Sequence, residues 1–244
     1  MRIKFDTHTH TLASAHAYST VAENAAYAAR VGMDGFAVTE HGPAMPDAPH
    51  EWFFHNLKNL PGELYGQKML IGAEVDLLDK NGKLDLGDDL LSRLDVVGAS
   101  IHGPVYADND AEDHTSAYEA AVLHPNIDIL CHSGSPQYKY DYEYIIKLAR
   151  DNNKLIEINN HSFFVRRSSI ENCRRIAELC KKYGTGITVS SDAHFFTDIG
   201  NYAQALEMLD EIDFPEELVM NTTYEKFETY LREKRGKEPM KWRL

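Results

Sequence analysis

The sequence predicts an α/β barrel, and two of its features lead to that prediction. Short apolar runs, as expected of strands buried on both faces, alternate with amphipathic stretches of helical spacing. Such alternation implies a parallel sheet with right-handed crossovers. Histidines and acids follow most of the strand-like runs, and the carboxyl ends of barrel strands meet on one face. We find about seven strands where a complete TIM barrel has eight, so we expect a distorted seven-stranded (βα) TIM-like barrel.

The predicted strands are short runs dominated by apolar residues. They cover Ile3–Asp6, Gly35–Thr39, Met69–Val75, Asp95–Ile101, Ile127–Cys131, Leu155–Asn159 and Gly186–Ser190.

Predicted helices lie between most of these strands. The sequences T-V-A-E from Thr20 and S-S-I-E from Ser168 have the spacing of capping boxes and should each begin a helix. Gly32 and Gly184 should end these two helices, because glycine readily adopts the left-handed conformation of a helix C-terminus. Apolar residues at helical spacing predict two more helices, over Glu112–Leu123 and Tyr142–Asp151.

Two segments depart from the alternation. Leu77–Leu86 carries Asn81 and Gly82 at its centre, a pair that favours a type I′ turn, so we expect a β-hairpin after the third strand. Gly42–Pro49 contains three prolines and directly follows His41. We expect it to form a stiff loop beside the functional face.

The rest of the sequence is consistent with one domain over residues 1–244. Hydrophobic residues make up 43% of the chain, and no linker, repeat or low-complexity run divides it. The first strand follows Met1 so closely that we expect no signal peptide, and no apolar run has the length of a membrane span. Three cysteines without C-x-x-C spacing favour a reducing compartment, so a cytoplasmic protein is expected.

The net charge of −13 excludes several partner classes. A chain this acidic lacks the basic surface that binds nucleic acid, and it should not adhere to anionic membranes. Bound divalent cations would make a cleft locally positive, so a small anionic substrate remains compatible with the charge.

Imidazole and carboxylate side chains after the strands predict a metal site, since they are the usual ligands of zinc, manganese and iron. H-x-H at the first strand and D-x-H at the last each place two donors on one face. Glu74 lies within an apolar strand, where a carboxylate is costly unless it is paired or metal-bound. The candidate ligands are His8, His10, His16, His41, Glu74, His102, His132, Asp192 and His194.

Other residues are assigned with their alternatives. His16 lies in a loop and could instead be an exposed residue before a helix. Cys131 should point away from His132 because side chains alternate along a strand. The sixth strand shows no obvious ligand. After it come Asn159, a candidate substrate contact, and His161, which could touch substrate without binding metal.

Arg166 and Arg167 are prominent in so acidic a chain. Guanidinium groups suit bidentate phosphate binding, and the pair comes just before a predicted helix N-terminus, which also favours anions. The alternative is a solvated pair in surface salt bridges.

These motifs resemble the PHP (polymerase and histidinol phosphatase) domain over essentially the whole chain. The stretches A-H-A-Y-S-T, D-A-P-H, E-I-N-N and D-F-P are more similar to its YcdX-type probable phosphatases than to histidinol phosphatase itself. The sequence motifs on which the resemblance to the PHP domain depends are H-T-H, T-E-H-G, G-A-E, S-I-H-G, C-H-S-G and S-D-A-H. The resemblance implies a distorted seven-stranded barrel with a trinuclear metal site, often zinc. It also implies three ligand sets, of which the first two share Glu74 as a bridge: His8, His10, Glu74 and Asp192; Glu74, His102 and His132; His16, His41 and His194.

The implied activity is hydrolysis of small phosphomonoesters by a metal-bound hydroxide, with Glu74 and Asp192 acting through three zinc ions, or manganese or iron in their place. Asp6 and Glu40 adjoin ligands and are candidates to orient them. Three alternatives stay open: an amidohydrolase-type metal hydrolase, a nuclease with the same site, and a non-catalytic metal-binding protein. A homo-oligomer is possible.

Overall fold

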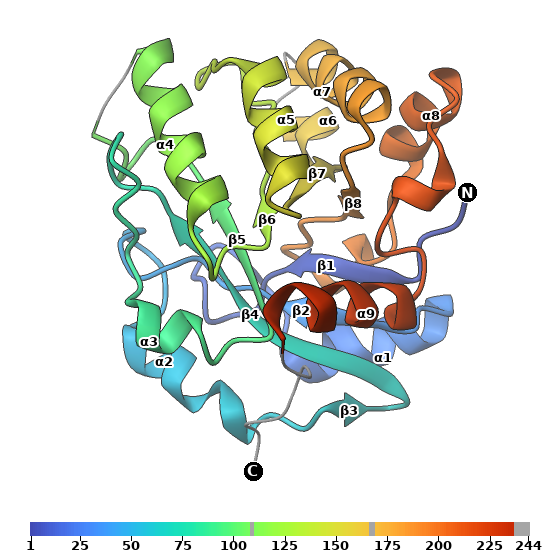
Figure 1. The fold of residues 1–244 in the computed structure, drawn as a ribbon. Coiled ribbons are helices and arrows are strands. Elements are labelled where there is room, and N and C mark those ends of the chain that lie inside the picture. The colour runs from blue at the N-terminus through green and yellow to red at the C-terminus, as the bar shows by residue number, and fades with distance from the viewer. Residues whose placement is uncertain (108–109, 166–168, 237–244) are drawn as a thin grey trace.

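In the computed structural model, which describes residues 1–107, 110–165 and 169–236, parallel strands form the nearly closed barrel that the sequence predicts (Figure 1). Neighbouring strands follow the order β1-β2-β4-β5-β6-β7-β8, and the short β3, which the sequence did not indicate, pairs antiparallel with β4. The strands are β1 (Phe5–Thr9), β2 (Gly35–Val38), β3 (Glu63–Leu64), β4 (Gln67–Asp76), β5 (Val96–Ser100), β6 (Ile129–Leu130), β7 (Leu155–Asn159) and β8 (Ile187–Ser190).

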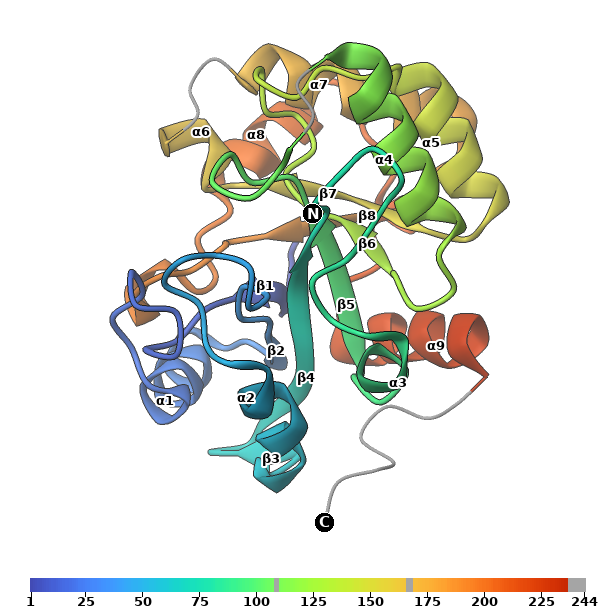
Figure 2. The ribbon, with the colours of Figure 1, turned by 90° about the vertical axis from the view of Figure 1, so that its left-hand side faces the viewer.

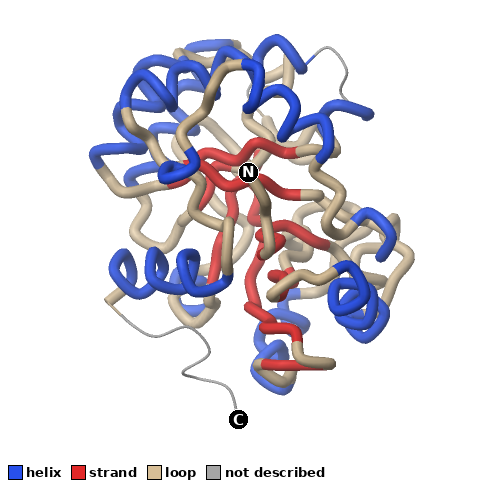
Figure 3. The backbone as a smooth tube through the Cα atoms, turned by 90° about the vertical axis from the view of Figure 1, so that its right-hand side faces the viewer, coloured by secondary structure: helices blue, strands red, loops and turns tan. Residues whose placement is uncertain are grey.

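Helices surround the strands, which occupy the middle of the molecule (Figures 2 and 3). The α-helices are α1 (Val21–Val31), α2 (Glu51–Asn56), α3 (Asp88–Leu91), α4 (Ala111–Leu123), α5 (Tyr142–Asp151), α6 (Ser162–Val165), α7 (Ile170–Tyr183), α8 (Ala203–Glu211) and α9 (Tyr224–Arg235). Short 3₁₀ turns are η1 (Leu57–Asn59), η3 (Phe196–Asp198) and η4 (Glu216–Leu218). None of the helices in the described ranges has the length and apolar character that crossing a membrane requires.

The predicted helix ends are largely confirmed. The capping box of Thr20 and Glu23 is present at the start of α1, and Gly32 ends that helix with a φ of 77°. Gly184 ends α7 in the same left-handed conformation, with a φ of 72°. Ser168, which was expected to begin α7, lies outside the described residues.

The hairpin expected over Leu77–Leu86 is wrong. One antiparallel bridge, between Leu77 and Leu84, and a 2.8 Å hydrogen bond from the Leu78 backbone nitrogen to the Lys83 carbonyl oxygen join the two sides of this loop, and no strand pair forms. Asp79 Oδ1 accepts hydrogen bonds from the backbone nitrogens of Asn81 and Lys83, and this local capping competes with strand pairing. Gly82 has a positive φ but Asn81 does not, so the turn is not the type I′ turn that the pair favours.

The seam between β1 and β8 is closed by a side chain instead of a continuous ladder. The Asn221 amide nitrogen donates to the carbonyl oxygens of Phe5 and Val189 at 2.8 and 2.7 Å. Its Oδ1 accepts from the backbone nitrogen of Val189 at 3.0 Å. Asn221 therefore satisfies backbone groups that an eighth barrel strand would otherwise pair.

Helix α9 closes the amino-terminal end of the barrel. Its Tyr224, Phe227, Tyr230 and Leu231 form one apolar cluster with inward-pointing residues of the strands, and with Cys131 after β6; the strand residues are Phe5, Ala37, Leu70, Val96, Ile129 and Leu155. The end of α9 adds a buried ion cluster, in which Asp128 pairs with both Lys234 and Arg235. Burial opposes the charge of Asp128, but the two cations hold the pKa of its carboxyl below the ordinary value.

Candidate metal centre

The site lies at the opposite, carboxyl end of the strands. Phe5 of β1 packs inside the barrel against Phe227, yet His8, three residues later, also points inward. Regular alternation would place two residues at this spacing on opposite faces. The register of β1 against β2 shifts between Asp6 and Thr9, and this irregularity turns His8 and His10 into the interior.

Four side chains at the centre bring one donor atom each to a common point. The Nε2 atoms of His8 and His10 lie 3.0 Å apart. Asp192 Oδ1 lies 3.2 Å from His10 Nε2 and 3.5 Å from His8 Nε2. Glu74 Oε2 lies 3.3 Å from His8 Nε2 and 3.6 Å from His10 Nε2. Ligands about 2.0–2.1 Å from a tetrahedral zinc are about 3.3–3.4 Å from one another, so the separations among His8, His10 and Glu74 fit a single ion, with Asp192 beside the two histidines.

The other carboxylate oxygen of Glu74 faces a second pair of histidines. Glu74 Oε1 lies 2.6 Å from Nε2 of His132 and 3.5 Å from Nε2 of His102. The Ser100 hydroxyl also donates to Glu74 Oε1. Glu74 therefore presents one oxygen to each of two groups of imidazoles, an arrangement that a bridging carboxylate requires.

A third group of imidazoles covers the centre from the loop side. The ring centroid of His16 lies 5.0 Å from that of His41 and 4.7 Å from that of His194. The ring centroids of His10 and His41 are 4.3 Å apart. His41 Nδ1 lies 2.8 Å from Glu74 Oε2. All nine predicted ligands thus lie in one contiguous cluster, and the donor atoms of His10, His41 and His194 are close enough together to hold an ion.

Several donor atoms of this cluster are buried without a hydrogen bond. His10 Nδ1 and His41 Nε2 have no hydrogen-bond partner within the described part of the chain, and the 2.8 Å contact between His41 Nδ1 and Glu74 Oε2 lacks hydrogen-bond geometry. Buried polar atoms are nearly always satisfied, because leaving one unpaired costs about 1–3 kcal/mol. The residues present therefore fit a group that would complete their bonding, and divalent metal ions suit this donor set.

Acidic side chains behind the cluster fix the orientation of the histidines. Glu157 Oε1 lies 2.7 Å from His8 Nδ1, and Asp76 Oδ1 lies 2.7 Å from His102 Nδ1. Asp47 of the proline-rich loop lies 2.5 Å from His16 Nδ1. Such carboxylate–histidine pairs fix the tautomer and orient Nε2 for binding a metal.

Glu157 is the residue that sequence reasoning missed. The sixth predicted strand, now β7, seemed to carry no ligand, yet the Glu157 side chain is buried inside the barrel. It also accepts hydrogen bonds from the Ser190 hydroxyl at 2.5 Å and the His132 backbone nitrogen at 2.6 Å. The signal was available, because a carboxylate inside an apolar strand was the argument that singled out Glu74.

The expected direction of Cys131 is also wrong. Its Sγ lies within 4.8 Å of the donor atoms of both His8 and Glu157, so it points inward like its neighbour His132. His132 has a φ of 27°, and this left-handed conformation ends the alternation on which the expectation depended. Asp192 has a φ of 53°. Strained backbone at two candidate ligands is typical of functional sites.

The electrostatics separate the central acids from the surrounding ones. Burial disfavours the charged form of Glu74, but His8, His41, His102 and His132 hold the pKa of its carboxyl well below the ordinary value. Burial raises the pKa of Glu40 to about 7. Hydrogen bonds from the hydroxyl groups of Thr11 and Ser14, at 2.6 and 2.7 Å, lower this pKa but do not offset the effect of burial. Glu40 Oε2 is 3.9 Å from His10 Nδ1.

The candidate substrate residues have different outcomes. The Asn159 amide nitrogen donates to Glu157 Oε2 at 3.2 Å and to Asp192 Oδ2 at 3.1 Å, so its buried side chain joins two carboxylates of the site. Arg166 and Arg167 lie outside the described residues. Asp6 accepts from the backbone nitrogens of His8 and Ser191 at 3.4 and 3.1 Å and so ties β1 to the end of β8.

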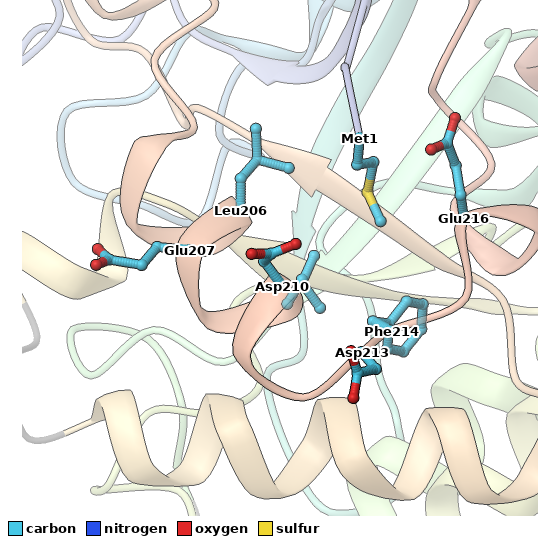
Figure 4. A pocket seen from close by; sticks show the side chains of 8 residues that line it. Met1, Leu206, Glu207, Asp210, Asp213, Phe214 and Glu216 are labelled. Carbon is cyan, nitrogen blue, oxygen red and sulfur yellow. The ribbon is translucent and has the colours of Figure 1, made fainter.

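Two pockets lie at different distances from the cluster. One of about 210 Å³, lined in part by Asn160, His161 and Ser191, adjoins it. A larger one of about 480 Å³ lies beside Met1 and α8 (Figure 4). Its polar side chains are the carboxylates of Glu207, Asp210, Asp213 and Glu216, and it includes none of the candidate site residues.

Comparisons with known proteins identify the family of this chain. The PHP domain model matches residues 6–233. A probable phosphatase of Clostridium novyi is 46% identical over 96% of this chain and 96% of its own length. A probable phosphatase of Acetivibrio thermocellus is 44% identical over 96% of this chain and 98% of its own.

The fold also resembles a solved structure of histidinol phosphate phosphatase from Lactococcus lactis, complexed with zinc, L-histidinol and phosphate. The TM-score is 0.62 at 17% identity, covering 88% of this chain and 95% of that one. At this identity the likeness concerns the fold. The predicted phosphatase activity agrees with the names of the curated relatives. This chain belongs to the PHP domain family.

Proposed function

We propose that this protein is a metal-dependent phosphatase that hydrolyses small phosphomonoesters at a centre of three divalent ions. The observation that carries the proposal is the convergence of His8, His10 and Glu74, whose donor atoms lie 3.0 to 3.6 Å apart as around one tetrahedral ion, with Asp192 Oδ1 3.2 Å from His10 Nε2. The names of the curated relatives support the reaction class.

We assign the nine candidate ligands to three sets, and the contacts within the cluster support this assignment. His8, His10, Glu74 Oε2 and Asp192 would hold the first ion, and Glu74 Oε1 with His102 and His132 the second. His16, His41 and His194 would hold the third. Imidazole-rich sets favour zinc, with manganese or iron as further candidates. When bound, such ions supply hydroxide at neutral pH and neutralise charge on phosphate.

The protein's own groups prepare the site for this chemistry. Glu157 and Asp76 hold His8 and His102 through their Nδ1 atoms, so that each Nε2 faces the centre. Asn159 joins Glu157 to Asp192 and so keeps the first set in place. In our proposal Arg166 or Arg167 binds a phosphate oxygen, as guanidinium geometry favours.

Charge favours a phosphatase over the nuclease alternative. The chain carries 38 acidic and 25 basic residues, so it repels a polyanion such as DNA or RNA. An amidohydrolase would typically have a metal-bridging lysine at the fourth barrel strand. In this chain His102 follows that strand, β5, so this alternative is disfavoured.

The proposal is tested by assaying one preparation on a panel of phosphomonoesters, including an aryl phosphate, and on single-stranded oligonucleotides. We expect hydrolysis of the monoesters, loss of activity with chelator and recovery with zinc or manganese. Faster cleavage of the oligonucleotides would identify a nuclease instead, and no turnover on either would indicate a binding protein.

A further inference from the structure

The pocket of about 210 Å³ beside the metal centre has no role in the chemistry proposed so far. Its walls come from the end of β7, from α6, from the end of β8 and from η3 with the turn that follows it. The lining residues are Asn160, His161, Phe164, Ser191, Asp198 and Asn201.

This pocket begins one side chain away from the candidate ligands. The ring centroid of His161 lies 5.7 Å from that of His194. Ser191 directly precedes Asp192, and Asn160 follows Asn159, whose amide nitrogen is 3.1 Å from Asp192 Oδ2. A phosphate group bound at the centre could therefore extend its ester group past His161 into the pocket.

The described residues that line this pocket combine one carboxylate with neutral polar and apolar side chains. Asp198 is its only acidic or basic side chain, apart from His161, in the part of the chain that the structure describes. Asn160 Oδ1 accepts a hydrogen bond from the Ala205 backbone nitrogen at 3.0 Å, which fixes that side of the wall. Phe164 is 46% exposed and offers an apolar surface. The volume is below the range of about 300–1,000 Å³ that drug-sized ligands occupy.

We infer that this pocket binds the alcohol part of a small phosphomonoester, and that Asp198 determines which alcohols are accepted. This inference rests on the proposed function and specifies which phosphomonoesters the enzyme would select. The Asp198 carboxylate can accept a hydrogen bond from a hydroxyl or amine group on the alcohol. It repels a second anionic group, such as a carboxylate or another phosphate, because like charges close together are unfavourable.

The test uses alkyl phosphates of two to four carbons that differ only in their far end, which is a hydroxyl, an amine or a carboxylate. For the wild-type enzyme we expect kcat/KM to be about ten-fold or more lower for the carboxylate compounds than for the hydroxyl compounds. Asp198→Asn should reduce this difference to a few-fold, with bound metal and inhibition by inorganic phosphate unchanged. Asn201→Asp, which adds a carboxylate to the same pocket, should widen it.

Asp213→Asn is the matched control, because Asp213 lines the distant pocket beside α8. It should leave the substrate ranking as in the wild type. Two results would overturn the inference while leaving the proposed phosphatase activity intact. One is the same ranking of substrates by kcat/KM in the wild type and Asp198→Asn. The other is a wild-type kcat/KM that does not depend on the group at the far end of the substrate. Wild-type protein that hydrolyses no phosphomonoester would overturn the proposed function as well.

Discussion

The two ends of the barrel hold buried charge in opposite ways. At the amino-terminal end, Asp128 is fully buried but paired with Lys234 and Arg235, and its Oδ2 also accepts from the Val97 backbone nitrogen at 2.8 Å. At the carboxyl end, Glu74 is equally buried but faces only histidines among its ion-pair partners in the described ranges, and His10 Nδ1 and His41 Nε2 there lack hydrogen-bond partners.

This difference between the two ends indicates that one contributes mainly to stability and the other mainly to function. The amino-terminal cluster pairs Asp128 with two cations of α9 and fastens that helix over the apolar interior, so its removal should cost stability without affecting chemistry. The carboxyl-terminal cluster is left incomplete, as expected of a site whose bonding is finished by bound ions. Substitutions at the two ends should therefore have separable effects.

The largest effect should come from Glu74→Gln at the carboxyl end. The change removes the charge that faces both groups of imidazoles, so we expect activity to fall by about 1,000-fold or more and metal content to fall with it. The thermal unfolding midpoint of the metal-free protein should stay close to that of metal-free wild type, because barrel stability lies in the packed core. Wild-type activity in this variant would show that Glu74 is not a bridging ligand.

The complementary change is Asp128→Asn at the amino-terminal end. It leaves Lys234 and Arg235 buried without their anion, which should lower the free energy of unfolding by about 3–5 kcal/mol. Metal content and kcat should stay at wild-type values below the unfolding temperature. Loss of bound metal in the folded variant would contradict the separation of the two ends.

The same pair gives a pH dependence with a definite sign. Because the cations hold the pKa of Asp128 below its ordinary value, the stabilisation is present above the unfolded pKa of about 3.9 and is lost as the pH falls through the lower folded value. Denaturant titrations should therefore show the gap between wild type and Asp128→Asn narrowing below about pH 4. A constant gap at all pH values would show that the charge is not its cause.

A smaller effect is expected from Glu157→Gln, which weakens the hold on His8 without removing a predicted ligand. Outer partners of this kind contribute about 10–100-fold to metal affinity. Competition with a chelator should show a loss in that range, together with recovery of activity in excess zinc. Unchanged metal affinity would assign Glu157 to the packing of the barrel interior alone.

The smallest effect is expected from the arginine pair. Arg166→Ala or Arg167→Ala should raise KM and weaken inhibition by phosphate by about ten-fold, with bound metal unchanged. Steady-state kinetics of both variants, with metal analysis of each, check this. Kinetics like those of the wild type for both variants would show that the pair has no role in phosphate binding.

The barrel could be predicted from the sequence because its strands are short apolar runs separated by clear helix ends. Thr20 and Gly32 bound α1 as expected, and β7 has the predicted limits. The convergence of histidines followed from the same pattern, since residues after parallel strands meet at one end.

The features that could not be predicted depend on tertiary contacts or on single backbone angles. The left-handed conformation of His132 turns Cys131 inward, and no propensity signals it. Asp79 replaces a hairpin with a capped loop. Asn221 closes the seam between β1 and β8 through bonds to residues far away in sequence.

The central claim, that the incomplete cluster is a centre for three ions, is tested most directly by elemental analysis of protein purified without chelator. The account predicts more than two equivalents of zinc, manganese or iron per chain, and fewer in Glu74→Gln than in Asp128→Asn. A stoichiometry of one ion or less in the folded wild-type protein would contradict it.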